Sequence, residues 1–270
     1  MKIVKEINIL TSSYSPIMTD WDSFLENIEK ELSKTKCDLY FFRGHNDTSW
    51  KLTPSIYREV FKKFQNPRQF ELSLHIDFSS NCGPIYNRKL NDWDILLEMR
   101  HAGLPTRLLD WTENFGSALF FSLRDVNWDD KENLKKYQPC IWILNPYKLN
   151  KEFFNEKNIS VLSHLDVEYD EATSNSKAEI KKRFPGPIPL IVARRQRIFA
   201  QKSVFTFHPL DYGPIEKICQ SCVKKFEIPL DCIPNAKNFL KLAGINEYSM
   251  YPDLDGLGRY LKDFHKIDSV

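Results

Sequence analysis

The spacing of apolar residues changes from a helical to a strand-like period early in the chain. Residues 20–34 begin at an aspartate and bring four apolar side chains to one side of a helix. Residues 37–44, CDLYFFRG, then alternate and are rich in aromatic side chains, which predicts a strand that ends at Gly44. The chain therefore opens with a helix followed by a strand that carries Arg43 near its end.

Helical and strand-like patterns interchange over the rest of the chain. Two helical patterns lie in residues 51–81, and a further helix over 92–103 closes at Gly103. Pro105 prevents that helix from continuing, so residues 104–111 are predicted to be loop or strand. The remaining predicted elements are, in order, a helix at 112–123, a strand at 139–146, two strands joined by a basic turn within 188–209, and a C-terminal surface helix.

This interchange predicts the fold class. Strands interrupted by helices indicate one α+β domain with a central mixed or antiparallel sheet and flanking helices. No internal repeat or low-complexity linker divides the chain. We expect a domain over residues 21–265, preceded by an N-terminal extension over residues 1–20.

Composition narrows the class of protein. The 38 Lys and Arg residues against 36 Asp and Glu residues leave a formal charge of +2, so no global basic surface exists for nucleic acid or an anionic membrane. The N-terminus lacks the apolar core of a signal peptide, and no apolar run approaches the roughly 18 residues of a membrane span. We expect a cytoplasmic protein without a membrane partner, and the Lys/Asn-rich composition suits a bacterial or phage setting.

The cysteines are too sparse for a disulfide scaffold. Six are spread over 270 residues, which predicts reduced thiols. Cys219 and Cys222 form a CxxC pair that could hold half of a zinc site or a redox pair. Only Cys232 and His208 lie nearby, without paired spacing, so two buried small apolar residues are the favoured interpretation. No metal site is expected.

Three stretches carry candidate chemistry, and the first is FFRGHNDTSW at residues 41–50. Arg43, at the end of an apolar strand, could bind a phosphate or carboxylate through two hydrogen bonds. Gly44 would let a ligand approach the backbone closely. Taken alone, a structural ion pair of Arg43 with an acid such as Asp47 is the simpler interpretation.

The second stretch, residues 100–116, crowds polar side chains before an apolar helix. Arg107 and Asp110 are three apart, on opposite faces of a regular strand, so each is expected to have a non-local partner. Thr112 could place its hydroxyl at an anion site at the helix start, or it could cap the helix. His101 ends a helix whose dipole favours the charged imidazole, or it is a structural histidine.

The third stretch, residues 194–209, contains Gln201 among apolar side chains. A glutamine there could hydrogen-bond a ribose hydroxyl or a base edge. Seven basic residues and no acidic one lie between Lys181 and Leu210, which indicates either an anion-binding surface or a solvated charged face. The chain has no Gly-rich phosphate loop, HExxH helix or GxSxG elbow, which argues against those chemistries.

Together, FFRG, RHAGLPTRLLDWT, RIFAQKSVF and GINEYSMYPDLDGL resemble, in that order, the motifs of the FRG domain family, named for its Phe-Arg-Gly motif. The resemblance covers nearly the whole chain, which would make residues 21–265 the FRG domain. The family usually has glutamine where this chain has Arg100, an aromatic residue at Ala102 and glycine at Ser203. The matching motif residues are Arg43, Gly44, His101, Gly103, Pro105, Thr106, Arg107, Asp110, Trp111, Thr112 and Gln201.

The order of these parts looks like that of ADP-ribosyltransferases, which use an arginine on the first core strand, a Ser/Thr motif before a helix, and a late Glu/Gln-bearing strand. The likeness implies a similar fold and an NAD ligand, from which ADP-ribose is transferred to a protein or nucleic-acid acceptor, or which is hydrolysed. On this interpretation the residues are assigned as cofactor-binding (Arg43, Gly44, Arg107, Asp110) and catalytic (His101, Thr112, Gln201).

A second interpretation is a non-catalytic module that binds nucleotides or nucleic acid, for example in a bacterial defence or toxin system. Arg43, Arg107 and the basic residues of 181–202 would contact phosphates, and affinity would fall steeply with salt. A metal-dependent nuclease lacks support, since the glutamates at 59, 71 and 98 fit exposed helix positions. Both leading interpretations place the same side chains in one cleft: Arg43, His101, Arg107, Asp110, Thr112 and Gln201.

Overall fold

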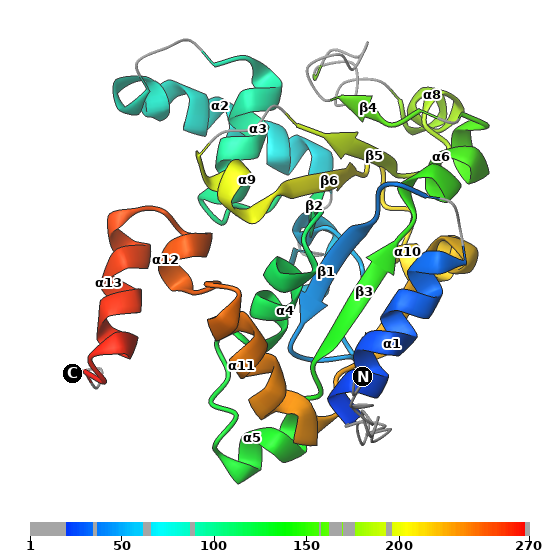
Figure 1. Cartoon of the computed structure of the whole chain (residues 1–270). Coiled ribbons are helices and arrows are strands. Elements are labelled where there is room, and N and C mark those ends of the chain that lie inside the picture. The colour runs from blue at the N-terminus through cyan, green and yellow to red at the C-terminus, as the bar shows by residue number, and fades with distance from the viewer. Residues whose placement is uncertain are drawn as a thin grey trace, which may run out of the picture.

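A computed structural model describes residues 20–34, 37–61, 66–86, 90–156, 158–161, 169, 176–192 and 196–267. Within them the chain folds into one α+β domain around a seven-stranded sheet, as the sequence predicts (Figure 1). The strand order is β4-β5-β6-β2-β1-β3-β7, and all neighbours are antiparallel except β4 and β5. The strands are β1 (Phe41–His45), β2 (Leu108–Thr112), β3 (Cys140–Leu144), β4 (Ser160–Val161), β5 (Ile188–Ile191), β6 (Ser203–Phe207) and β7 (Val223–Glu227).

Helices flank the sheet and connect its strands (Figure 1). The α-helices are α1 (Asp20–Ser33), α2 (Pro67–Cys82), α3 (Asp92–His101), α4 (Phe115–Leu123), α5 (Lys131–Lys136), α6 (Pro146–Phe154), α8 (Lys177–Arg183), α9 (Gln196–Gln201), α10 (Ile215–Ile218), α11 (Ile233–Leu242), α12 (Glu247–Met250) and α13 (Leu254–Phe264). Short 3₁₀ turns are η1 (Ser55–Tyr57), η2 (Glu59–Phe61), η3 (Gly83–Ile85), η5 (Gln220–Cys222) and η6 (Leu230–Cys232).

The two faces of the sheet contribute to different apolar clusters. On one face, Phe42 and Ile141 pack with side chains of α1, α4 and α11. On the other, Phe41 and Trp142 pack with Leu52 and with residues of α10 and η5. A third cluster joins β5 and β6 to α3 and α8. Alternate residues of each central strand therefore enter different clusters, because strand side chains point to opposite faces.

Helix α4 lies directly against the backbone of β1, and Gly44 makes this approach possible. A Cβ at Gly44 would overlap the Ala118 carbonyl oxygen and lie 2.6 Å from the Ser122 backbone nitrogen. The absent side chain therefore serves helix-to-strand packing. The expectation that Gly44 leaves room for a ligand is corrected in this respect, although the residue also lines the cavity described below.

Most predicted elements are confirmed, with two differences. The first helical pattern predicted in residues 51–81 forms only the 3₁₀ turns η1 and η2 within the described residues, and the second difference lies between β5 and β6. The predicted basic turn is in part helix α9, so Gln201 ends a helix, where the prediction placed it beside a strand. Residues 193–195 of that turn lie outside the described residues. Gly103 closes α3 with φ +83°, and Asn114 caps α4 by accepting a hydrogen bond from the Ser117 nitrogen at 3.2 Å.

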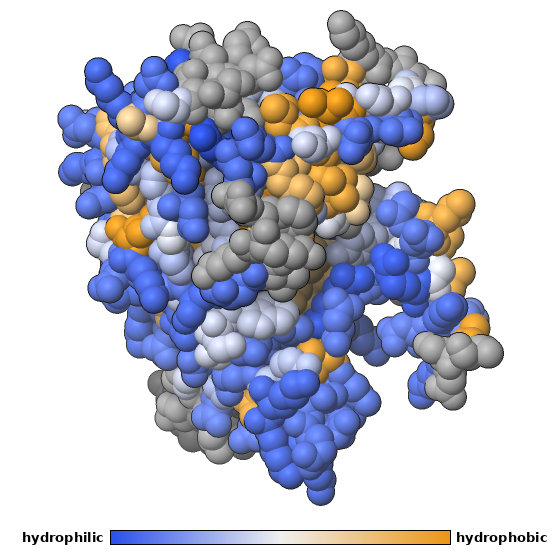
Figure 2. Space-filling model, turned by 180° about the vertical axis from the view of Figure 1, so that it is seen from behind, coloured by the Kyte–Doolittle hydropathy of each residue, from blue (hydrophilic) through white to orange (hydrophobic). Residues whose placement is uncertain are grey.

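Helix α13 projects from the main body (Figures 1 and 2), whereas α12 packs against that body through Met250. Several large apolar residues of this C-terminal segment are exposed: Tyr248, Leu254, Leu261, Phe264 and Ile267. Among the described helices none has the length and apolarity that crossing a lipid bilayer requires.

Candidate functional site

The sheet is split between its two central strands. β1 and β2 pair at one position, Phe42 with Thr112, whereas β1–β3 and β2–β6 each pair at five. A cavity of about 340 Å³ lies beside this gap. Its walls come from β1, β2 and β6, the end of α3, α4, Trp50, Gln201 and Tyr251. We call this cavity the cleft.

Arg43 bridges the two strands where they separate. Its Nη1 donates to the backbone carbonyl of Asp110 at 2.6 Å, and its Nε donates to His45 Nε2 at 2.8 Å. In a continuous sheet, the Asp110 carbonyl would accept a hydrogen bond from the backbone of the neighbouring strand. Here the Arg43 side chain donates that hydrogen bond instead. Nη2 of Arg43 has no hydrogen-bond partner within the described ranges.

Asp110 is held by a second guanidinium. Nε of Arg100 donates to Oδ1 at 3.1 Å and to Oδ2 at 2.9 Å, and Nη2 of Arg100 also contacts Oδ2. Arg43 Nη1 lies 3.7 Å from Oδ2. Nη1 of Arg100 keeps its two N–H groups without a partner among the residues described. The carboxylate is therefore clamped from one side, while donors of both arginines remain available.

The charges of this cluster reinforce one another. Burial acts to raise the pKa of Asp110, but the guanidiniums of Arg100 and Arg43 hold that pKa below its ordinary value. Burial lowers the pKa of Arg43 to about 10, and Asp110 opposes that shift. Asp110 raises the pKa of Arg100 above its ordinary value. At neutral pH all three groups are charged, and the cleft has more positive than negative charge.

His45 is a buried, neutral histidine in the cleft wall. Burial and the charges of Arg43 and Arg58 lower its pKa to about 2. Because Nε2 accepts from Arg43, the ring proton belongs on Nδ1, which has no hydrogen-bond partner within the described part of the chain. The residue is 2% exposed. The Nδ1 atom is itself enclosed, and the Trp50 backbone acts to raise the pKa of the ring against these larger effects.

Thr112 and Gln201 build the wall. The Thr112 hydroxyl donates to the Gln201 carbonyl at 2.6 Å and accepts from the Asn114 nitrogen at 3.0 Å. The Gln201 side-chain amide donates to the Met250 carbonyl at 2.9 Å, which ties α9 to α12. Thr112 thus neither caps α4 nor offers a free hydroxyl at its start. Both side chains line the cleft through groups that already hold the fold together.

His101 lies at the end of α3, where the sequence places it. Its Nδ1 is 3.6 Å from Glu98 Oε2, and the ring lines the cleft. Glu98 also accepts a hydrogen bond from the Tyr86 hydroxyl at 2.8 Å. His101 is therefore positioned by a carboxylate and presents an imidazole to the cavity.

Arg107 lies away from the cleft, so the expectation that it shares the cavity is corrected. Its side chain and that of Glu71 are 0% exposed. Glu71 Oε2 accepts from Arg107 Nε at 2.5 Å, and Oε1 accepts from the Arg107 backbone nitrogen at 2.6 Å. The guanidinium also lies over the ring of Phe207. Glu71 is likewise corrected from an exposed to a fully buried position, because Arg107 requires a counter-charge there.

Of the seven residues assigned from the sequence, Arg107 alone does not line the cleft. The six that do are Arg43, Gly44, His101, Asp110, Thr112 and Gln201. The sequence patterns indicate Arg100 only as a departure from the family motif, and they assign no role to His45, Trp50 or Tyr251. The position of Arg100, ten residues before Asp110 and just before a helix-ending glycine, was the available signal. The others are brought in by tertiary packing.

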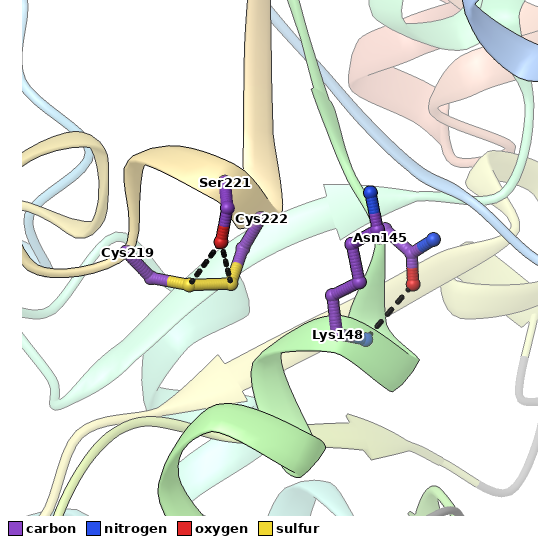
Figure 3. The surroundings of a disulfide bond; sticks show 5 residues. All are labelled: Asn145, Lys148, Cys219, Ser221 and Cys222. Carbon is purple, nitrogen blue, oxygen red and sulfur yellow. Dashed lines mark hydrogen bonds between the residues drawn. A yellow bond between two sulfur atoms is a disulfide. The ribbon is translucent and has the colours of Figure 1, made fainter. Parts of the chain in front are cut away.

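The two cysteines of the CxxC pair are bonded to each other. Cys219 and Cys222 form a disulfide between α10 and η5, which corrects the expectation of free thiols for these two residues (Figure 3). Both are buried, and the Ser221 hydroxyl lies next to both sulfurs. A search of the described residues finds no group of three or more His, Cys, Asp or Glu side chains arranged to bind a metal ion.

Comparison with known proteins gives one match. The family model described as FRG domain matches residues 38–131, which include β1, α3, β2, α4 and Arg43, Arg100 and Asp110 of the cleft. No curated protein and no solved structure matches the chain. The wider domain boundary at residues 21–265 stays a prediction. The similarity to the FRG domain family is thus shown for residues 38–131.

Proposed function

We propose that the cleft binds a phosphate-bearing nucleotide, with NAD as its ligand. The observation that carries the proposal is the pair of unused donors, Nη2 of Arg43 and Nη1 of Arg100, in the wall of one cavity. Guanidinium groups bind phosphate oxygens through paired, charge-assisted hydrogen bonds. In a cavity partly shielded from water, such donors favour an anion more strongly than they would on an open surface.

The aromatic part of the wall suits the rest of a nucleotide. Phe121 and Tyr251 line the cleft, and so does Trp50, 48% of whose surface is exposed. Ring faces bind bases and nicotinamide by stacking, which tolerates different ring identities. The combination of guanidiniums with aromatic faces is therefore suited to a nucleotide more than to inorganic phosphate alone.

The proposed reaction is cleavage of the bond between nicotinamide and ribose in NAD. The bonding electron pair goes to the nicotinamide nitrogen, and the ribose carbon becomes cationic. An acceptor oxygen or nitrogen, or water, then forms the new bond and releases its proton. Asp110 is the one carboxylate among the residues described as lining the cleft, and it is ionised at neutral pH. It is the group that would stabilise this cation, while His101 would hydrogen-bond a ribose hydroxyl.

Two variants test binding and chemistry separately. We expect Arg43→Ala to weaken NAD binding by about tenfold or more, because a charge-assisted contact is lost. We expect Asp110→Asn to bind NAD more tightly, since a negative charge is removed, yet to lose roughly a hundredfold or more of nicotinamide release. Calorimetry measures the first quantity and release of labelled nicotinamide the second. Lys241→Ala, on an exposed part of α11, is the matched control for loss of one charge.

A non-catalytic nucleotide- or nucleic-acid-binding module is the second candidate. The observation in its favour is that Arg100 holds both oxygens of Asp110, so this carboxylate is not free to approach a ribose. This candidate predicts that Asp110→Asn tightens binding, that wild type releases no nicotinamide, and that affinity falls steeply with salt. Both candidates fail if wild type binds neither NAD, ADP nor pyrophosphate.

A further inference from the structure

A second cavity of about 430 Å³ adjoins the cleft. The two cavities share His45 and Trp50 in their walls. The second cavity is otherwise lined by residues outside the cleft, among them Lys51, Arg58 and Asp211. Each cavity alone is of the size that holds a small ligand or part of a larger one. We call the boundary formed by His45 and Trp50 the junction.

Positive charge is concentrated at the junction. Arg43 and Arg100 line the cleft side, and Arg58 lines the second cavity. Besides burial, the charges of Arg58 and Arg100 lower the pKa of Arg43, and the charge of Arg100 lowers that of Arg58. Arg58 donates through Nε to the Thr53 carbonyl at 3.2 Å, and its two Nη groups have no partner in the residues described. His45, which accepts from Arg43, forms part of both cavity walls at the same place.

Away from the junction the excess positive charge disappears on both sides. The second cavity balances Lys51 and Arg58 with the carboxylates of Glu59 and Asp211. One oxygen of Asp211 accepts from the Gly213 nitrogen at 3.0 Å, and the other has no partner among described residues. The cleft is also lined by Gln201 and by aromatic rings, which are uncharged. Phosphate is therefore favoured at the junction, and uncharged groups with hydroxyls are favoured on either side of it.

Trp50 links the two cavities physically. Its indole packs edge-to-face against the His45 ring, with centroids 5.8 Å apart, and about half of its surface stays exposed. A rigid aromatic face that is anchored on one side and open on the other is suited to stacking against a base.

We propose that the second cavity is the other half of the ligand site, so that a dinucleotide spans both cavities with its diphosphate at the junction and one nucleoside in each. The proposal rests on the proposed function, namely that the cleft holds a phosphate-bearing nucleotide. Asp211 then accepts a hydrogen bond from a ribose hydroxyl, and Trp50 stacks on the base of the same nucleoside.

The test adds a bulky side chain to the second cavity and compares the binding of the dinucleotide NAD with that of its mononucleotide and pyrophosphate parts. Lys51 lines this cavity and not the cleft, and its side chain is exposed, so Lys51→Trp adds bulk there. Calorimetry with purified full-length chain measures the affinities for NAD, ADP, nicotinamide mononucleotide and inorganic pyrophosphate. We expect Lys51→Trp to weaken NAD and one of the two mononucleotides by about tenfold, and to change pyrophosphate by less than about threefold. Lys241→Trp, with the same change of charge and bulk on α11, is expected to change none of them.

A second variant gives a signature of opposite signs. Asp211→Asn keeps an oxygen for the Gly213 nitrogen but removes the negative charge. We expect weaker binding of the nucleoside-containing ligands that Lys51→Trp weakens, and equal or tighter binding of pyrophosphate. The dinucleotide proposal would be overturned if both variants kept the wild-type affinity for NAD while Arg43→Ala weakened NAD binding. Equal weakening of all ligands, or a loss of transfer to an acceptor at unchanged NAD affinity, would also overturn it. Failure of the proposed function is distinct, because wild type would then bind none of the four ligands.

Discussion

Two arginine–carboxylate clusters lie on opposite sides of the segment 107–112, and they differ in what surrounds them. Arg107 and Glu71 are fully enclosed, and both oxygens of Glu71 accept hydrogen bonds from Arg107 or from the Tyr169 hydroxyl. Arg100 and Asp110 are partly exposed at a cavity, and donors remain unused. The same pair of residue types is thus a packing element on one side and a candidate ligand site on the other.

The difference in burial and hydrogen-bond pairing distinguishes a charged cluster that serves the fold from one that could bind a ligand. Burial of both charges is costly, so the enclosed cluster is stable only when every polar atom is paired. In the cleft, water or a ligand can satisfy the unused donors, so incomplete pairing carries little cost. The unused donors, more than the presence of an ion pair, mark the cleft as the place where an anion would bind.

The largest expected effect is at the enclosed cluster. Glu71→Gln leaves the Arg107 guanidinium buried without a counter-charge, and we expect a loss of about 3–5 kcal/mol in the free energy of unfolding. Urea denaturation measures this quantity. Glu98→Gln, at a partly buried glutamate that accepts from Tyr86, is the matched control and is expected to lose much less. A loss below about 1 kcal/mol for Glu71→Gln would contradict the view that the enclosed cluster is a structural element and the cleft cluster is not.

We expect pH to have an intermediate effect on the free energy of unfolding. A buried neutral histidine lies near each cluster: His208 near Arg107, and His45 in the wall of the cleft. Burial lowers the pKa of His208 to about 3, and burial with nearby guanidiniums lowers that of His45 to about 2. Below pH 6.5 the unfolded chain binds protons that the folded chain does not, so stability falls on acidification. The slope is about 1.4 kcal/mol per pH unit for each histidine.

Urea denaturation between pH 7 and pH 5 measures that slope. Repeating it with a bound ligand distinguishes the two histidines. His208 Nε2 is already paired with the Thr206 hydroxyl at 3.0 Å, whereas His45 Nδ1 is unpaired and lies at the cleft. A bound diphosphate should raise the pKa of His45 and flatten the slope, and His45→Gln should remove this ligand effect. An equal ligand effect in His45→Gln would contradict the placement of the anion beside His45.

The smallest expected effect on stability is at the cleft. Arg100→Ala removes a partly exposed ion pair, for which we expect a loss of about 1 kcal/mol or less. Its effect on ligand affinity should be larger, about tenfold for NAD or pyrophosphate. Thermal unfolding and calorimetry measure the two quantities in the same preparation. A stability loss as large as that of Glu71→Gln would show that both clusters serve only the fold.

Local patterns were sufficient for most elements and for part of the cleft. The helix at 20–34, the strand ending near Gly44 and the helix closed by Gly103 follow from periodicity and turn residues, and all are present. Helix α9 was missed because a short, basic segment between two strands has no helical period of its own. Gln201 was expected to face a ligand, but its amide is bound to the Met250 carbonyl, a partner 49 residues away that no local pattern indicates.

The sequence by itself determined the α+β class, several of the elements and the opposite orientation of Arg107 and Asp110, because these depend on spacing along a few residues. Only the tertiary structure decided which arginine is enclosed and which is left with free donors. That decision depends on Glu71, His45, Trp50 and Arg100, which come from separate elements. Burial and pairing of a charge are set by whichever distant side chains pack against it, and a linear pattern does not contain that information.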